Sequence, residues 1–221
     1  IFTTANVAVD QNQLSMETMK RVATRHGLVC LLHEKPYAGV NGSGKHNNWS
    51  IGTDTGENLL DPGDTPNENL QFLLVLSCIM KAVDEHADLL RASASCVGNE
   101  HRLGAQEAPP AIISIFLGDQ LDNVVNQIVS NADSVKLLTT GKLDSGVLNK
   151  DATDRNRTTP FAFTGNKFEF RMVGSSDSIA DANTTLNAIV AEALCEAADQ
   201  LEQADDFNAA CTKLIHDNMA Q

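Results

Sequence analysis

The sequence predicts an α+β fold, in which strands and helices follow one another without regular βαβ alternation. Three observations support this class. Side chains from Lys167 to Val173 alternate strictly between apolar and polar, as in a half-buried strand. A helix start signal stands at Thr65, and the stretch from Ser178 to His216 is Ala-rich, acidic and helical in character. We expect one unit over residues 1–221, of which residues 178–221 are mainly helical.

The beginning of the chain predicts one helix, one strand and a long irregular segment. Apolar residues at helical spacing indicate a helix from Asn12 to His26, which Gly27 ends. The short apolar run from Leu28 to Leu32 indicates a buried strand. The segment from Glu34 to Gly63 is rich in Gly, Asn, Asp and Pro, so it is too broken for continuous regular structure. It is also longer than ordinary connections, which favours a functional loop.

The middle of the chain carries the clearest helix start. Thr65 and Glu68 form a capping box, which predicts a helix from Thr65 to about Ala92. Farther along, Ala111 to Phe116 is predicted as a strand and Asp119 to Asn131 as a helix. Helices and strands therefore occur in both halves of the chain, as the α+β class requires.

Composition argues against two classes of function. The net charge of the 221 residues is −13, whereas binding to nucleic acid requires clustered Lys and Arg. The longest apolar run, Phe72 to Met80, is far shorter than the roughly 18 residues that cross a bilayer. The five cysteines form no CxxC pair and indicate a reducing compartment. We expect a cytoplasmic protein, with an organelle as the alternative, and neither nucleic acid nor a membrane as its partner.

A Gly-rich segment matches the P-loop pattern in its letters but not in its surroundings. Gly39 to Lys45 reads GxxxxGK. A P-loop would continue with Ser or Thr for Mg²⁺ and with a helix whose N-terminus holds phosphate. Here His46 follows the lysine, and residues 47–52 favour a strand over a helix. We therefore interpret the segment as something other than a nucleotide-binding P-loop.

The same segment has a second interpretation centred on a histidine. His46, Asn48 and Ser50 recur at every second residue, so an extended chain presents an imidazole, a carboxamide and a hydroxyl on one side. Gly42 and Gly44 would let the backbone approach a ligand closely. A binding site is one reading of this pattern, and a surface histidine beside a glycine turn is the other.

Four segments, found in matching order, resemble signatures of the glutamine synthetase family. They are KPYAGVNGSG together with NGSGKHNNWS, RLGAQEAP from Arg102 to Pro109, the R-N-R run that ends at Arg157, and the E-x-R pair of Glu169 and Arg171. The resemblance covers most of Ile1 to Asn183. The residues of these segments are most similar to those of type III, the long-subunit class. The resemblance implies a curved, mainly antiparallel sheet flanked by helices.

The resemblance also implies a role for each matching residue. His46 and Glu169 match ligands of a divalent metal ion, Mg²⁺ or Mn²⁺, on the ATP side of the site. Contacts to glutamate or to the phosphoryl group in transfer match Asn41, Gly42, Arg102 and Arg171. Contacts to ATP match Phe2, Asn48, Ser50 and Arg157. Glu107 matches a loop carboxylate that closes over glutamate and helps to deprotonate ammonium.

The activity that the resemblance implies is ATP-dependent ligation of ammonia to L-glutamate through γ-glutamyl phosphate. The family works as a homo-oligomer with active sites between subunits. Its remaining metal-binding glutamates match positions before Ile1, so we expect residues 1–221 alone to be inactive. Ala162 and Lys167 stand where relatives carry arginines, which leaves the phosphate contacts there open.

Two alternative functions remain at this stage. One is a different enzyme on the same scaffold, such as a γ-glutamylamide synthetase or a relative of guanido kinases. The other is a catalytically silent assembly or regulatory protein. Substrate profiling with other amines would distinguish the first alternative from a glutamine synthetase. A titration with divalent metal would distinguish the second.

Overall fold

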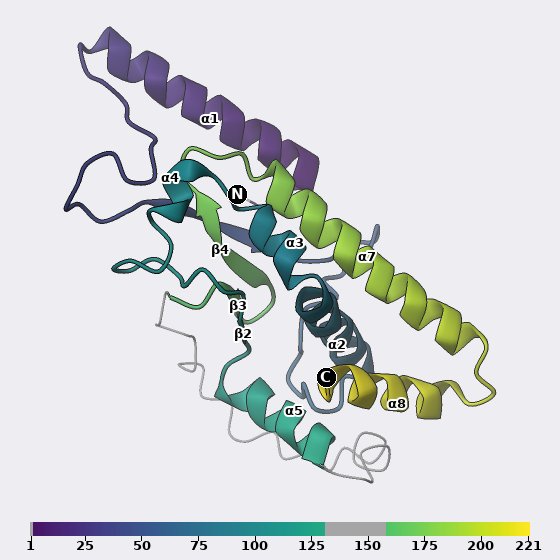
Figure 1. Cartoon of the computed structure of the whole chain (residues 1–221). Helices are drawn as coiled ribbons and strands as arrows, with labels where there is room; N and C mark the ends of the chain where they lie inside the picture. The colour runs from purple at the N-terminus through teal and green to yellow at the C-terminus, as the bar shows by residue number, and fades with distance from the viewer. Residues whose placement is uncertain (1, 131–157) are drawn as a thin grey trace.

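The computed structural model describes residues 2–130 and 158–221 of the chain, and its centre is a four-stranded sheet (Figure 1). The strand order is β1-β4-β3-β2. β1 pairs antiparallel with β4 and β4 antiparallel with β3, whereas β3 and β2 are parallel. The strands are β1 (Gly44–Trp49), β2 (Ile115–Phe116), β3 (Phe161–Phe163) and β4 (Phe168–Gly174). A mixed sheet combined with helices confirms the α+β class in its general form.

The alternating segment forms a strand, β4, as predicted, and β4 lies in the interior of the sheet. Phe168, Phe170 and Met172 are each 0% exposed, because the sheet and the helices cover them. The rings of Phe161 and Phe168 stack with their centroids 4.4 Å apart, which ties β3 to β4 on the same face. β4 is therefore anchored by its aromatic residues while Glu169 and Arg171 occupy the alternate positions.

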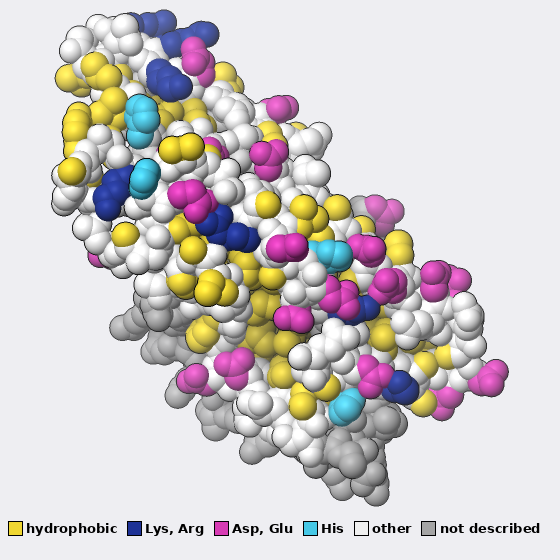
Figure 2. Space-filling model, in the orientation of Figure 1, with side chains coloured by type: hydrophobic (Ala, Val, Ile, Leu, Met, Phe, Trp, Pro, Cys, Tyr) yellow, Lys and Arg dark blue, Asp and Glu magenta, His cyan; other side chains and the backbone are white. Residues whose placement is uncertain are grey.

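The other regular elements of the described residues are helices. They are α1 (Ala5–Arg25), α2 (Leu70–Glu85), α3 (Ala87–Ala92), α4 (Val97–Glu100), α5 (Asp119–Ser130), α7 (Ala180–Glu202) and α8 (Phe207–Met219). α2 packs against α7 and α8 to form the helical part of the core, and α1 lies beside the beginning of α7 (Figure 1). Acidic side chains gather over α7 and α8 on the face shown in Figure 2. No helix in residues 2–130 or 158–221 is long and apolar enough to cross a membrane.

The predicted helix start at Thr65 is wrong. α2 begins at Leu70, and the side chain of Asn69 caps it by accepting a hydrogen bond of 3.0 Å from the backbone N–H of Phe72. Residues 65–68 instead form a turn in which the N–H of Glu68 donates to the carbonyl of Thr65. Asn69 is a strong cap directly before the buried apolar run, so it displaces the earlier signal.

The predicted buried strand from Leu28 to Leu32 is also wrong. The segment pairs with no strand among the described residues, and Leu28 and Val29 are 65% and 83% exposed. Without a partner strand, an apolar run cannot satisfy its backbone groups in a buried sheet. Gly27 does end α1, with a φ of 69°, but that helix begins at Ala5 and not at Asn12.

The remaining elements agree more closely with the sequence. α5 matches the helix predicted at Asp119, and α7 and α8 make up the helical region after residue 178. The strand predicted from Ala111 to Phe116 shortens to Ile115–Phe116, since only these two residues pair with β3. The helix expected to reach Ala92 is divided at His86 into α2 and α3.

Candidate functional site

β1 presents one polar face to solvent and one buried face to α7. Asn47 donates to Asn183 Oδ1 at 2.9 Å, and the Trp49 indole N–H donates to Asn187 Oδ1 at 2.9 Å. His46 and Asn48 lie on the opposite, exposed face, with Ser50 exposed just beyond the strand. The period of two predicted for this segment therefore holds. Because the residues after Lys45 form a strand, the helix that a P-loop requires is missing at this position.

His46, Glu169 and Arg171 form a connected cluster across β1 and β4. The Nδ1 atom of His46 lies 2.6 Å from Glu169 Oε1. Arg171 donates to the other oxygen, Glu169 Oε2, from Nε at 3.2 Å and from Nη2 at 3.0 Å. Exposure of the side chains falls from 40% for His46 to 17% for Glu169 and 3% for Arg171. The cluster thus runs from the surface into the protein, with the arginine fork fixed at its inner end.

The donor atoms of this cluster fit a divalent metal ion. An imidazole nitrogen and a carboxylate oxygen are suitable ligands for Mn²⁺, and the carboxylate suits Mg²⁺. His46 and Glu169 bring one of each to the same point. They supply two ligand positions, so water, substrate or other segments would have to complete the coordination shell.

A β-bulge lies at the cluster. The register pairs Lys45 with Val173 but Asn47 with Phe170, so two residues of β4 face His46. These two residues are Arg171 and Met172. A bulge redirects side chains and increases local twist, and bulges are over-represented beside active sites. Here it sets the direction of Arg171 relative to Glu169.

Two adjoining cavities lie on the exposed side of β1, next to α1. One, of about 400 Å³, is lined in part by Phe2, Asn48, Ser50 and Lys167. The other, of about 500 Å³, reaches His46 and is lined also by Phe2 and Asn48. The Lys167 ammonium lies 5.6 Å from the centre of the Phe2 ring. Three of the four residues expected to contact ATP therefore meet around one space, while Arg157 lies outside the described residues.

Arg102 occupies a buried position beneath the glycine turn. It is 4% exposed, and burial lowers the pKa of its guanidinium, with the carboxylate of Glu34 opposing that shift. A methyl group at Gly44 would overlap the guanidinium, and one at Gly42 would press on its aliphatic stem. Gly42, expected with Asn41 to contact glutamate, is thus directly above Arg102. The two glycines are needed because an arginine fills the space below them.

The loop that carries Glu107 is closed by its own backbone. The N–H of Gly104 donates to the carbonyl of Pro109 at 2.8 Å, and Gln106 adopts a left-handed φ of 55°. Glu107 is exposed and makes no hydrogen bond or ion pair within the described residues. The structure therefore does not join Glu107 to the His46 cluster. A strained residue beside a free carboxylate is consistent with a loop that changes position.

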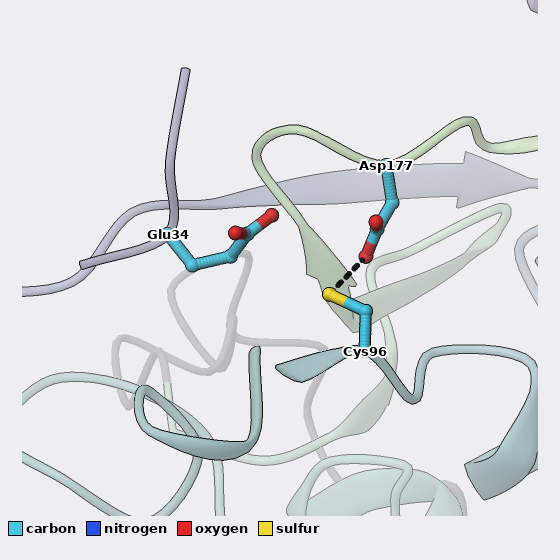
Figure 3. Close-up of side chains that lie close together, drawn as sticks. All are labelled: Glu34, Cys96 and Asp177. Carbon is cyan, nitrogen blue, oxygen red and sulfur yellow. Dashed lines mark hydrogen bonds between the residues drawn. The ribbon is translucent and has the colours of Figure 1, made fainter. Parts of the chain in front are cut away.

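Sequence reasoning missed a buried carboxylate, Glu34. It is 2% exposed, and its Oε1 accepts from the backbone N–H of Ser176 at 2.8 Å and from the Ser176 hydroxyl at 2.6 Å. Figure 3 shows it directed toward Cys96 and Asp177, which come from two other segments. Cys96 donates to Asp177 Oδ2 at 3.1 Å. Nothing in the local sequence around Glu34 signals burial, because its partners lie far along the chain.

Neighbouring protein groups stabilise the buried carboxylate of Glu34, which with Cys96 and Asp177 forms what we call the Glu34 group. Burial by itself would raise the pKa of Glu34, but the hydrogen bonds from Ser176 hold it below its ordinary value. The ammonium of Lys45 donates to the backbone carbonyl of Asp177. A methyl group at Gly98 or at Gly174 would overlap the Glu34 carboxylate, so both glycines make room for it. Glu34, Cys96 and Asp177 therefore form a packed, hydrogen-bonded polar group.

Comparison with known proteins gives consistent results. Residues 1–110 match the glutamine synthetase catalytic domain. The chain is 61% identical over 199 residues to a type-3 glutamine synthetase of Dictyostelium discoideum, covering 88% of this chain and 27% of that protein. It is 49% identical over 228 residues to a glutamine synthetase of Bacteroides fragilis (strain YCH46), covering 100% of this chain and 30% of that protein.

A third relative, a glutamine synthetase of Butyrivibrio fibrisolvens, is 59% identical over 172 residues, covering 76% of this chain and 25% of that protein. The chain thus spans between a quarter and a third of the length of these relatives. The match to the catalytic domain includes His46, and the similarity to the Bacteroides fragilis protein extends over the whole chain, so it includes Glu169 and Arg171. By its motifs and by these similarities, the chain belongs to the glutamine synthetase family.

Proposed function

We propose that this chain is part of an enzyme that joins ammonia to L-glutamate at the expense of ATP. The observation that carries the proposal is the His46–Glu169–Arg171 cluster, which lies beside the cavity lined by Phe2 and Asn48. A metal-ligand pair, a fixed arginine fork and a space next to them are the parts that phosphoryl transfer requires. The names of the relatives agree with this chemistry.

Each group has a specific part in the proposed reaction. His46 and Glu169 would hold Mg²⁺ or Mn²⁺, which when bound neutralises charge on phosphate oxygens. Arg171 would pair with the phosphoryl group in transfer, because its fork is already oriented by Glu169. Phe2 would lie against adenine, and Asn48 and Ser50 would contact the nucleotide. Arg157 completes the proposed ATP contacts.

The glutamate side of the site would be formed by the glycine turn and the Arg102 loop. Backbone groups of Asn41 and Gly42 would contact glutamate, with Arg102 behind them as the positive group. The γ-carboxylate oxygen of glutamate attacks the γ-phosphorus of ATP, and ADP leaves. Glu107 first takes one proton from ammonium, and the ammonia formed attacks the acyl carbon. Inorganic phosphate leaves, and the nitrogen releases a second proton as the amide forms. Closure of the Glu107 loop would shield the acyl phosphate from water.

The proposals about sheet architecture, domain organisation and oligomeric state rest on membership of the family. The described strands would be part of a curved, mainly antiparallel sheet, and residues 1–221 would be the later portion of a catalytic domain. The protein would act as a homo-oligomer in which neighbouring subunits complete each site. Further metal ligands would come from the remainder of the polypeptide, because His46 and Glu169 provide only two.

The test is phosphate release by the full-length protein, measured with ATP, L-glutamate, ammonia and Mg²⁺ or Mn²⁺, each omitted in turn. We expect release to require all four, and residues 1–221 alone to be inactive. Equal activity of the isolated chain would show that its site is complete. Release supported better by other amines than by ammonia would favour a γ-glutamylamide synthetase. Absence of both metal binding and phosphate release would favour a silent or regulatory protein.

A further inference from the structure

The bulge in β4 has a backbone acceptor that its neighbouring strand cannot satisfy. The register pairs Phe161 with Phe170, which places Pro160 opposite Arg171. The N–H of Arg171 donates to the carbonyl of Pro160 at 2.9 Å. The reciprocal hydrogen bond cannot form, because proline has no N–H. A buried carbonyl left unpaired is destabilising, so the carbonyl of Arg171 needs another donor.

Side chains from the α4 region supply the missing donors. Arg102 Nη2 donates to the carbonyl of Arg171 at 3.1 Å, and Asn99 Nδ2 donates to the carbonyl of Met172 at 2.7 Å. Arg102 Nη1 also reaches the Met172 carbonyl, at 3.4 Å. Both carbonyls of the bulge are therefore held by side chains that approach from outside the sheet.

Asn99 is the residue that fixes this arrangement. It is 0% exposed, and its Oδ1 accepts from Arg102 Nη1 at 2.9 Å. Its Nδ2 donates to the carbonyl of Ala94 at 2.6 Å as well as to Met172. Three hydrogen bonds thus orient one carboxamide between the segment before α4, the Arg102 guanidinium and β4. A carboxamide with buried, satisfied partners has one orientation available, so it locks the arginine.

We infer that Asn99 is a positioning residue for the proposed metal and phosphoryl site. It acts through Arg102 and the β4 bulge, which set the direction of Glu169 and Arg171 toward His46. The inference rests on the proposed function for the meaning of that site. It matters because a displacement of about 1 Å in a catalytic group can reduce the rate on the order of 100-fold.

The experiment compares two substitutions of Asn99 in the full-length protein with a matched control. Asn99→Ala removes all three hydrogen bonds, and Asn99→Asp keeps the shape and the acceptor for Arg102 while losing both donors. The control is Asn218→Ala in α8, since Asn218 is also buried, at 7% exposure, and donates to Ser77 Oγ at 3.3 Å. The measurements are thermal unfolding, affinity for Mn²⁺ alone, and kcat and KM for ATP and glutamate.

We expect Asn99→Ala to weaken Mn²⁺ binding by about 10- to 100-fold, as loss of groups that orient metal ligands does elsewhere. kcat should fall by a similar factor, whereas Asn218→Ala should lower thermal stability with Mn²⁺ affinity and kcat kept within about twofold. Asn99→Asp should lie between wild type and Asn99→Ala, and it carries the test if the alanine variant does not fold. If Asn99→Asp has the same Mn²⁺ affinity and kcat as Asn218→Ala, the inference is overturned.

Failure of the proposed function gives a different pattern. In that case the wild-type protein itself shows no phosphate release that depends on ATP, glutamate and ammonia. The Mn²⁺ measurement still reports on the geometry of His46 and Glu169 in each variant. Wild-type activity combined with unchanged Mn²⁺ affinity in both Asn99 variants counts against the positioning role alone.

Discussion

His46 and Glu169 are 123 positions apart in sequence, yet His46 Nδ1 lies 2.6 Å from Glu169 Oε1 across two antiparallel strands. Their meeting depends on the pairing of β1 with β4. Because Glu169 also accepts two hydrogen bonds from Arg171, its carboxylate keeps one oxygen for His46 and one for the arginine. The proposed metal-ligand pair and the arginine proposed to bind the phosphoryl group thus share a single carboxylate.

His46→Ala should weaken binding of Mn²⁺ by about 10- to 100-fold and remove most activity, because one of the two proposed ligand atoms is lost. Isothermal titration of the full-length protein with Mn²⁺ and with ATP measures the effect. His86→Ala is a suitable control, since that histidine contacts Glu192 on α7 and lies outside the cluster. ATP affinity and turnover unchanged from wild type would remove His46 from the site.

Arg171→Lys should reduce kcat/KM for glutamate by about 10- to 100-fold. A lysine keeps the charge but replaces a fork that makes two hydrogen bonds to Glu169 with a single ammonium. A hydrogen bond to a charged group contributes about 1.5–3 kcal/mol, which corresponds to that range. Steady-state kinetics with varied glutamate provide the measurement, and wild-type values in the variant would contradict a substrate role.

Glu107→Gln should slow the use of ammonia by about 100- to 10,000-fold, the usual contribution of a general base. Formation of the acyl phosphate should change much less, since no proton is removed in that step. Rapid-quench measurement of ADP formation without ammonia, beside glutamine formation with it, separates the two steps. Gln106→Gly tests the loop independently, because glycine relieves the left-handed backbone without touching the carboxylate. Equal losses in both steps for Glu107→Gln would contradict the assignment.

Glu34→Gln should make stability less dependent on pH on the acid side. Hydrogen bonds from Ser176 hold the pKa of Glu34 below its ordinary value. Its contribution to stability is therefore complete above that ordinary pKa and is lost as the pH falls through the lowered pKa. Thermal unfolding of the full-length protein between about pH 3 and pH 7 measures this. The glutamine variant should unfold more easily at pH 7 and lose less stability on acidification. Asp10→Asn, at an exposed carboxylate of α1, should leave the curve unchanged.

Local patterns were sufficient for part of the fold and part of the site. The alternation around Phe168 and the spacing of His46 and Asn48 describe strands whose faces differ in polarity, and the structure places them so. The capping signal at Thr65 does not start a helix, and Asn69 caps α2 instead, because the buried apolar run begins only at Leu70. Two signals of similar strength compete there, and tertiary packing decides between them.

Other features depend on contacts that no local pattern contains. Glu34 belongs to a polar segment, and its partner Ser176, which donates a hydrogen bond to it, lies 142 positions away. Asn99 gains its role from the carbonyl of Met172, 73 positions away. The run from Leu28 to Leu32 failed as a strand prediction for a related reason, because a strand requires a partner that the run itself cannot specify.

The four glycines packed against Arg102 and the Glu34 group limit how this protein can be engineered. Replacing glycine with alanine commonly stabilises a fold by about 0.4–1 kcal/mol where the backbone conformation permits it. Gly42, Gly44, Gly98 and Gly174 all lie outside the left-handed region, so a survey of backbone angles would select them first. At each of them an added methyl group would meet a buried charged side chain or its carboxylate. Alanine substitutions at these four glycines would therefore lower the stability of the protein and disturb the order of the site.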